Sequence, residues 1–165
     1  MSTFKKQELN TVYFLTVMLC TVIIPSISVL LTIHFSEWDQ VTLSLFGKWF
    51  IFSAVGVRLF VAGIKQAIDP AFTAKQIFQM EHQESYPVIR ELGFANICFG
   101  LIGILSLFFP EWRTVSAFGS GLYFGIAGIQ HVLTKPEGIN EIIALVSDLF
   151  IFILLAVYFY FTISV

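Results

Sequence analysis

Residues 11–34, TVYFLTVMLCTVIIPSISVLLTIH, decide the fold class, because this stretch of 24 residues contains no Asp, Glu, Lys or Arg. A helix rises about 1.5 Å per residue, so about 20 apolar residues cross the roughly 30 Å of hydrocarbon in a bilayer. Lys5 and Lys6 before the stretch, and Ser26-Ile27-Ser28 within it, also resemble a cleavable signal peptide. The apolar run continues beyond that site, however, and is long enough to span. We therefore expect a first transmembrane helix, kinked near its middle by Pro25.

Four more stretches have the same character, at residues 46–66, 91–109, 114–133 and 142–162. The composition of the whole chain agrees, since 57% of its 165 residues are hydrophobic and 12% are charged, against about 25% charged in a soluble domain. A water-soluble globule is thereby excluded. We predict one transmembrane domain over residues 1–165, an all-α membrane protein with five transmembrane helices. Spans two to five form a four-helix bundle, and the N-terminal helix packs at its edge.

The charge and the cysteines exclude other classes. With 9 Lys+Arg against 11 Asp+Glu, the net charge is -2, so the chain has no basic surface to neutralise nucleic-acid phosphates. Nucleic acid is therefore not an expected partner. Cys20 and Cys98 lie in apolar runs and form no Cys-x-x-Cys motif, which is typical of small buried side chains.

The distribution of positive charge predicts the orientation, because Lys and Arg are retained on the cytoplasmic side. With the N-terminus inside, that side holds Lys5, Lys6, Lys65, Lys75, Arg90 and Lys135, whereas the other side holds Arg113. Aromatic side chains that anchor helix ends then fall at the outer interface: Trp38, Trp49, Trp112, Tyr158 and Tyr160. We expect a multi-pass protein of the plasma (inner) membrane, with the N-terminus cytoplasmic and the C-terminus outside.

The longest connection, residues 67–90, is cytoplasmic in this arrangement. Residues 71–80 have a ragged helical pattern of apolar side chains, which fits either a helix lying on the membrane surface or a partly ordered loop. The following Glu81-His82-Gln83-Glu84 offers metal-ligand types. Adjacent polar residues of this kind are more often simply solvated.

Polar side chains inside the spans are the candidate functional residues, because a charge at a helix centre costs about 2.5 to 3.5 kcal/mol on insertion scales. They are Arg58 in the second span, Glu91 and Asn96 in the third, His131 in the fourth and Asp148 in the last. All five fall in the cytoplasmic half of the predicted bundle. Lys48 lies near the outer edge, where its long side chain reaches water.

Small residues at helical spacing predict which spans pack together. One face of span three carries Gly93, Asn96, Gly100 and Gly103, and one face of span four carries Ala117, Gly121, Gly125 and Gly128. Small residues let helices approach closely in lipid. We expect spans three and four to pack through these faces, with Gly56 and Gly63 giving span two a similar face.

Several interpretations of the polar cluster remain open. In the first, Arg58 forms a buried ion pair, with Asp148 in preference to Glu91, while Asn96 and His131 hydrogen-bond between helices. In the second, the same groups orient a lipid-like or quinone-like molecule in a pocket. The others are a metal or haem site and a proton or ion path.

The chain carries no phosphate-binding loop and no nucleophile motif. Binding of a small apolar ligand, or an accessory role in a homo-oligomer or larger membrane complex, is therefore favoured over catalysis. Membrane lipids are the expected surroundings. No cofactor is assigned by the sequence.

Residues 46–158 resemble an uncharacterised family of small bacterial membrane proteins built on a four-helix unit, similar in style to the DoxX-like proteins. The matching stretches are Phe46-Gly47-Lys48-Trp49, Val55-Gly56-Val57-Arg58, Glu91-Leu92-Gly93-Phe94-Ala95-Asn96, Gly128-Ile129-Gln130-His131, and Asn140 followed by Asp148. The resemblance implies a helical bundle and no particular reaction. Gln66 stands where the family has a histidine, residues 81–87 depart from its aromatic-rich loop, and the first span lies outside the match.

Overall fold

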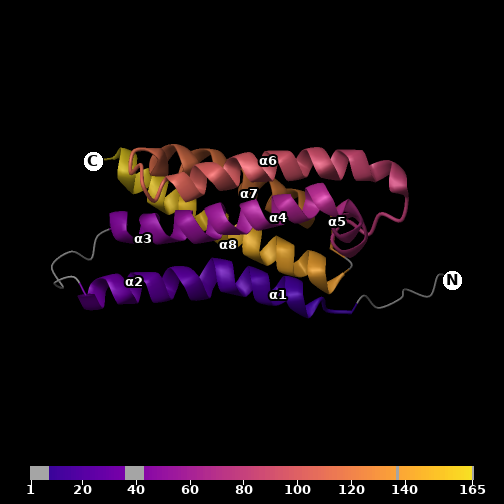
Figure 1. Cartoon of the computed structure of the whole chain (residues 1–165), viewed down its shortest axis with the longest axis horizontal. Helices are drawn as coiled ribbons and strands as arrows, with labels where there is room; N and C mark the ends of the chain where they lie inside the picture. The colour runs from indigo at the N-terminus through magenta and orange to yellow at the C-terminus, as the bar shows by residue number, and fades with distance from the viewer. Residues whose placement is uncertain (1–7, 36–42, 137, 165) are drawn as a thin grey trace.

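The computed structural model describes residues 8–35, 43–136 and 138–164, and within them all regular secondary structure is helical. Figure 1 shows long helices lying side by side along the longest axis of the molecule. Among the described residues, four stretches are long and apolar enough to cross a membrane: Thr11–Phe35, Leu43–Ile68, Gln83–Leu105 and Ile139–Ile163. Lys5, Lys6 and Trp38, which the predicted orientation uses, lie outside the described residues.

The first span consists of α1 (Thr11–Met18), the π-helix η1 (Leu19–Ile23) and α2 (Ile24–Phe35). In η1 the Ile24 N–H donates to the Leu19 carbonyl five residues earlier. Pro25 has no N–H to continue this pattern, which frees the Cys20 carbonyl. The Ser53 hydroxyl of the second span donates to that carbonyl at 2.7 Å. The neighbouring helix thus supplies the hydrogen bond that the proline removes.

The second span has the same build, with α3 (Leu43–Phe50), the π-helix η3 (Ile51–Val57) and α4 (Arg58–Ile68). The two π-helices contact each other. Ile51 and Val55 of η3 are fully buried and form the core with Phe124, Ile151 and Leu155 of the last two helices.

The connection after α4 folds back onto the bundle. It contains α5 (Pro70–Gln76), whose first residue is a proline, as suits a helix start. Thr73 and Ala74 are buried against neighbouring helices, and α5 packs against α4 and α6. Residues 71–80 were predicted to be either a helix or a partly ordered loop, and residues 71–76 are helical. Helix α5 covers one end of the bundle (Figure 1).

The third span is α6 (Tyr86–Leu105), preceded by the short 3-10 helix η4 (Gln83–Ser85). It packs closely along η3 and α4 through glycines. A methyl group added at Gly93 would lie 2.8 Å from the Gly63 carbonyl oxygen, and one at Gly103 would lie 2.7 Å from the Gly56 nitrogen. These backbones are in direct contact.

The last two helices, α7 (Trp112–Thr134) and α8 (Ile139–Ile163), form a second close pair. A methyl group at Gly125 would lie 2.8 Å from the Phe152 ring, and one at Gly128 would lie 2.6 Å from the Leu149 side chain. The prediction that spans three and four pack through their small-residue faces is therefore wrong, because each face is used against another helix. The helices α6 and α7 still touch, for example where Phe99 stacks on Tyr123 with ring centroids 5.6 Å apart.

Helix α7 is long enough to span but is not one of the four strongly apolar stretches. Apart from Phe124, its buried face is polar or small, with Arg113, Ser116, Ser120 and His131 beside Ala117 and its glycines. It ends where Lys135 adopts a left-handed conformation with φ 58° and Pro136 follows.

Candidate ligand-binding site

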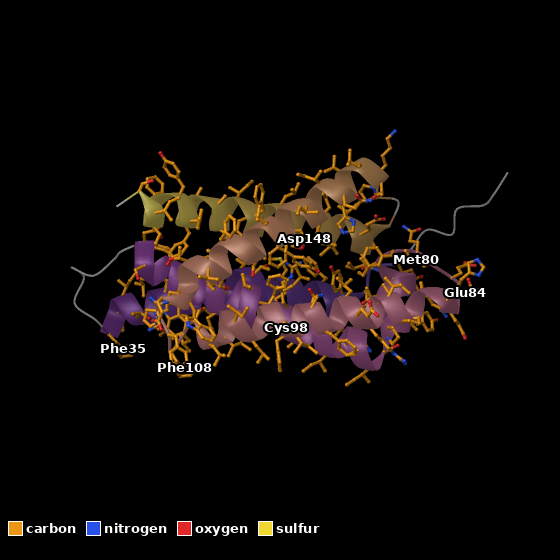
Figure 2. The ribbon with its side chains drawn as sticks, turned by 90° about the horizontal axis from the view of Figure 1, so that it is seen from above. Phe35, Met80, Glu84, Cys98, Phe108 and Asp148 are labelled. Atoms are coloured by element: carbon orange, nitrogen blue, oxygen red, sulfur yellow. The ribbon has the colours of Figure 1, made fainter. Side chains whose placement is uncertain are left out.

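A cavity of about 550 Å³ lies between the helices, within the range of about 300–1,000 Å³ typical of small-molecule sites. Its walls come from α1, α4, α5, α6, α7 and α8. Its apolar lining includes Val17, Leu59, Ala62, Phe72, Ile77, Leu92, Phe124, Ala127 and Ala144, and its polar lining includes Tyr13, Arg58, Gln66, Asn96, Tyr123, His131 and Asp148. In Figure 2, Asp148 lies in the middle of the bundle, whereas Phe108 lies toward one end and Glu84 toward the other.

Arg58 of α4 and Asp148 of α8 both line the cavity and form a buried ion pair. The Arg58 Nη2 donates at 2.8 Å to the Asp148 Oδ1 and at 2.8 Å to the Ser147 hydroxyl. The guanidinium also lies over the Phe124 ring, 5.0 Å from its centroid. The predicted pairing of Arg58 with Asp148 rather than Glu91 is therefore confirmed.

One nitrogen of this arginine has no hydrogen-bond partner among the described residues. Arg58 is only 9% exposed, and the nitrogen without a partner is its Nη1. Tyr13 of α1 interacts with the Arg58 side chain, but Nη1 itself still has no hydrogen-bond partner among the described residues. Because buried polar groups are nearly always hydrogen-bonded, this donor indicates a place for a ligand or water.

Asn96 repeats this situation on the facing helix α6. Its Nδ2 donates at 2.7 Å to the Oε1 of Gln66, but its Oδ1 has no partner among the described residues. Asn96 is 3% exposed, and the hydroxyl of Tyr123 lies beside it. The predicted interhelical hydrogen bond of Asn96 is confirmed, with a glutamine as the partner.

Two further basic side chains at the edge of the cavity lie beside carboxylates. His131 Nδ1 lies 3.3 Å from the Glu141 Oε1, and its ring stacks on Phe78 with an interplanar angle of 14°. Lys65 donates at 2.8 Å to Asp69, the residue after α4, and this hydrogen bond holds the pKa of that carboxyl below its usual range.

Glu91 does not belong to the site. Its side chain is exposed and does not line the cavity. A helix turns about 100° per residue, so Glu91, five positions before Asn96, points about 140° away from it.

Three residues that were not among the predicted site residues complete the site: Gln66, Tyr13 and Tyr123. Gln66 could have been found, because it lies three residues after Gly63 and so shares the face that packs on α6. Tyr13 and Tyr123 gave no signal, since aromatic residues are common throughout the spans.

Asn140 anchors the covered end of the bundle. It is fully buried, and its Oδ1 accepts from the Asn10 backbone nitrogen at 2.9 Å. Its Nδ2 donates to the Glu8 carbonyl at 3.3 Å and to the Gln76 Oε1 at 3.4 Å. One side chain therefore ties α8 to the start of α1 and to the end of α5.

The described residues contain no group of three or more His, Cys, Asp or Glu side chains arranged to hold a metal ion. Glu81, His82 and Glu84 in particular are all exposed. The part of the chain that the structure describes thus gives no specific support to a metal site.

Comparison with known proteins places the chain in one family. No curated protein and no solved structure matches it. The family match begins at residue 11 rather than near residue 46, so the first span, which supplies Tyr13 to the cavity, is part of the shared sequence. With residues 11–163 matched, the chain belongs to a family of unknown function, DUF6790.

Proposed function

We propose that this protein binds a lipid-like or quinone-like molecule in the cavity between its helices. The observation that carries the proposal is the cavity itself, which is mostly apolar and has a few buried polar groups in its wall. A subunit with a purely structural role would be close-packed, because protein interiors contain few voids larger than a water molecule. The cavity therefore favours a binding function over an accessory one.

The position of the opening supports an occupant that comes from the bilayer. Val12 of α1 and Val61 of α4 both line the cavity, and they are 75% and 45% exposed. The cavity thus reaches the surface between two apolar helices. In a membrane, acyl chains rather than water would cover such an opening.

The membrane arrangement is part of the proposal. Helix α7 acts as a fifth span, since it has 23 residues and packs along α8. The N-terminus is cytoplasmic, in agreement with the excess of Lys and Arg on that side. The cavity then lies in the cytoplasmic half of a plasma (inner) membrane protein.

A cavity-filling variant tests the proposal. Ala127→Phe places a ring at the cavity wall, whereas Ala95→Phe adds the same ring on an exposed face of α6. Native mass spectrometry of gently extracted protein should show an apolar molecule bound to the wild type and to Ala95→Phe, and its loss from Ala127→Phe.

Two results would contradict the proposal. One is that the wild type carries no bound molecule and takes up neither an added lipid nor a quinone. The other is equal retention by the two phenylalanine variants. An absorption spectrum of the same sample distinguishes a redox protein, because a haem would give a Soret band.

A further inference from the structure

We infer that the occupant of the cavity has an uncharged head group that both accepts and donates hydrogen bonds, as in a lipid alcohol or a quinol. This inference rests on the proposed binding function and names the class of ligand. It follows from two independent observations, the balance of charge around the cavity and the two buried atoms without partners.

The charge balance argues against an anionic head group. Each basic side chain that lines the cavity already has a carboxylate beside it: Arg58 with Asp148, Lys65 with Asp69, and His131 with Glu141. A fatty-acid carboxylate or a phosphate would add a negative charge for which the described residues lining the cavity offer no basic side chain without a carboxylate beside it. Burying such a charge without a counterion is strongly unfavourable.

The unpartnered atoms specify the hydrogen bonds that the head group must make. Arg58 Nη1 is a donor and needs an acceptor, while Asn96 Oδ1 is an acceptor and needs a donor. Both residues are at least nine-tenths buried and line the same cavity. A hydroxyl both donates and accepts, whereas a quinone or ester carbonyl can only accept and would leave Asn96 unpaired.

Two tyrosines of the cavity lining indicate where the head group lies. Tyr13 lies beside Arg58, and Tyr123 lies beside Asn96. A head group that contacts Arg58 and Asn96 therefore meets side chains of α1, α4, α6 and α7 at once. The apolar tail then extends along Val12 and Val61 toward the lipid.

Three probes with one C18 chain test the inference: oleyl alcohol, methyl oleate and oleate at pH 8. They present, in turn, a hydroxyl, an acceptor without a donor, and a negative charge. The full chain is delipidated in detergent, and the binding of each probe is titrated by native mass spectrometry. We expect oleyl alcohol to bind at least about tenfold more tightly than the other two, because each of them leaves a buried group unsatisfied.

Variants connect the preference to the two residues. Asn96→Leu should reduce the affinity for oleyl alcohol to about that for methyl oleate. Ser120→Ala is the matched control, because the Ser120 hydroxyl is also buried without a partner among the described residues but does not line the cavity. This control should keep the preference for the alcohol.

The outcomes separate this inference from the proposed function. If oleate or methyl oleate binds as tightly as the alcohol, the inference is overturned while the binding function stands. If neither these probes nor an added quinone binds, or all bind Ala127→Phe as they bind the wild type, the binding function itself fails. The wild-type series decides even if Asn96→Leu does not fold.

Discussion

Replacing Arg58 by Met should destabilise the protein by about 3 to 5 kcal/mol, because it leaves the Asp148 carboxylate buried without its counterion. Asp148→Leu should cost a similar amount, since the arginine loses its 2.8 Å partner and keeps only the bond to Ser147. If the two changes were independent, the double variant would lose about 6 to 10 kcal/mol. The double variant removes both charges, however. We therefore expect its loss of stability to be smaller than that sum by at least about 3 kcal/mol.

The assay is equilibrium unfolding of the four proteins in mixed micelles, followed by helical circular dichroism. Lys65→Met serves as the control, because Lys65 pairs with Asp69 four residues later and both side chains are exposed. That change should stay within about 0.5 kcal/mol of the wild type. Additive losses in the double variant would refute the reasoning and show that the two side chains act separately.

Two further predictions concern packing and topology. Gly100→Ala should destabilise the protein by about 1 to 3 kcal/mol, because its methyl group would lie 2.5 Å from a backbone nitrogen of α4. Gly119→Ala is the control, because its methyl group would meet a side chain at 3.5 Å. In the same unfolding assay this change should be neutral or slightly stabilising. In a background without native cysteines, a cysteine at Glu111 should react with an impermeant reagent from outside intact cells, whereas one at Gln83 should not, and labelling of both from one side would contradict the proposed orientation.

Much of the site could be predicted from the sequence, because charge in an apolar helix is rare and must be compensated. Arg58 and Asp148 were recognisable as partners from their depth alone, and their 2.8 Å contact confirms it. Glu91 was predicted to belong to the polar cluster from its depth in the span, without regard to the direction of its side chain. A carboxylate near a helix end can turn outward, and this one does.

The packing partners could not be predicted, because a stripe of glycines shows that a helix is approached closely but not by which neighbour. Gly93 and Gly103 fit Gly63 and Gly56 of the second span, while Gly125 receives a phenylalanine ring of α8. The choice depends on the shapes of both surfaces. The cavity was equally hidden, since it results from the way six helices leave space between them rather than from any one of them.

The paired π-helices have a consequence for how this family tolerates insertions and deletions. A π-helical turn holds one residue more than an α-helical turn, so it absorbs an extra residue and leaves the faces on either side in place. Removing one residue from Ile51–Val57 should therefore convert the segment to α-helix and keep Arg58 directed at Asp148. The same deletion within α4 would turn every later side chain by about 100°. Across the family, single-residue gaps are expected to fall in Leu19–Ile23 and Ile51–Val57 and to be rare elsewhere in these two spans.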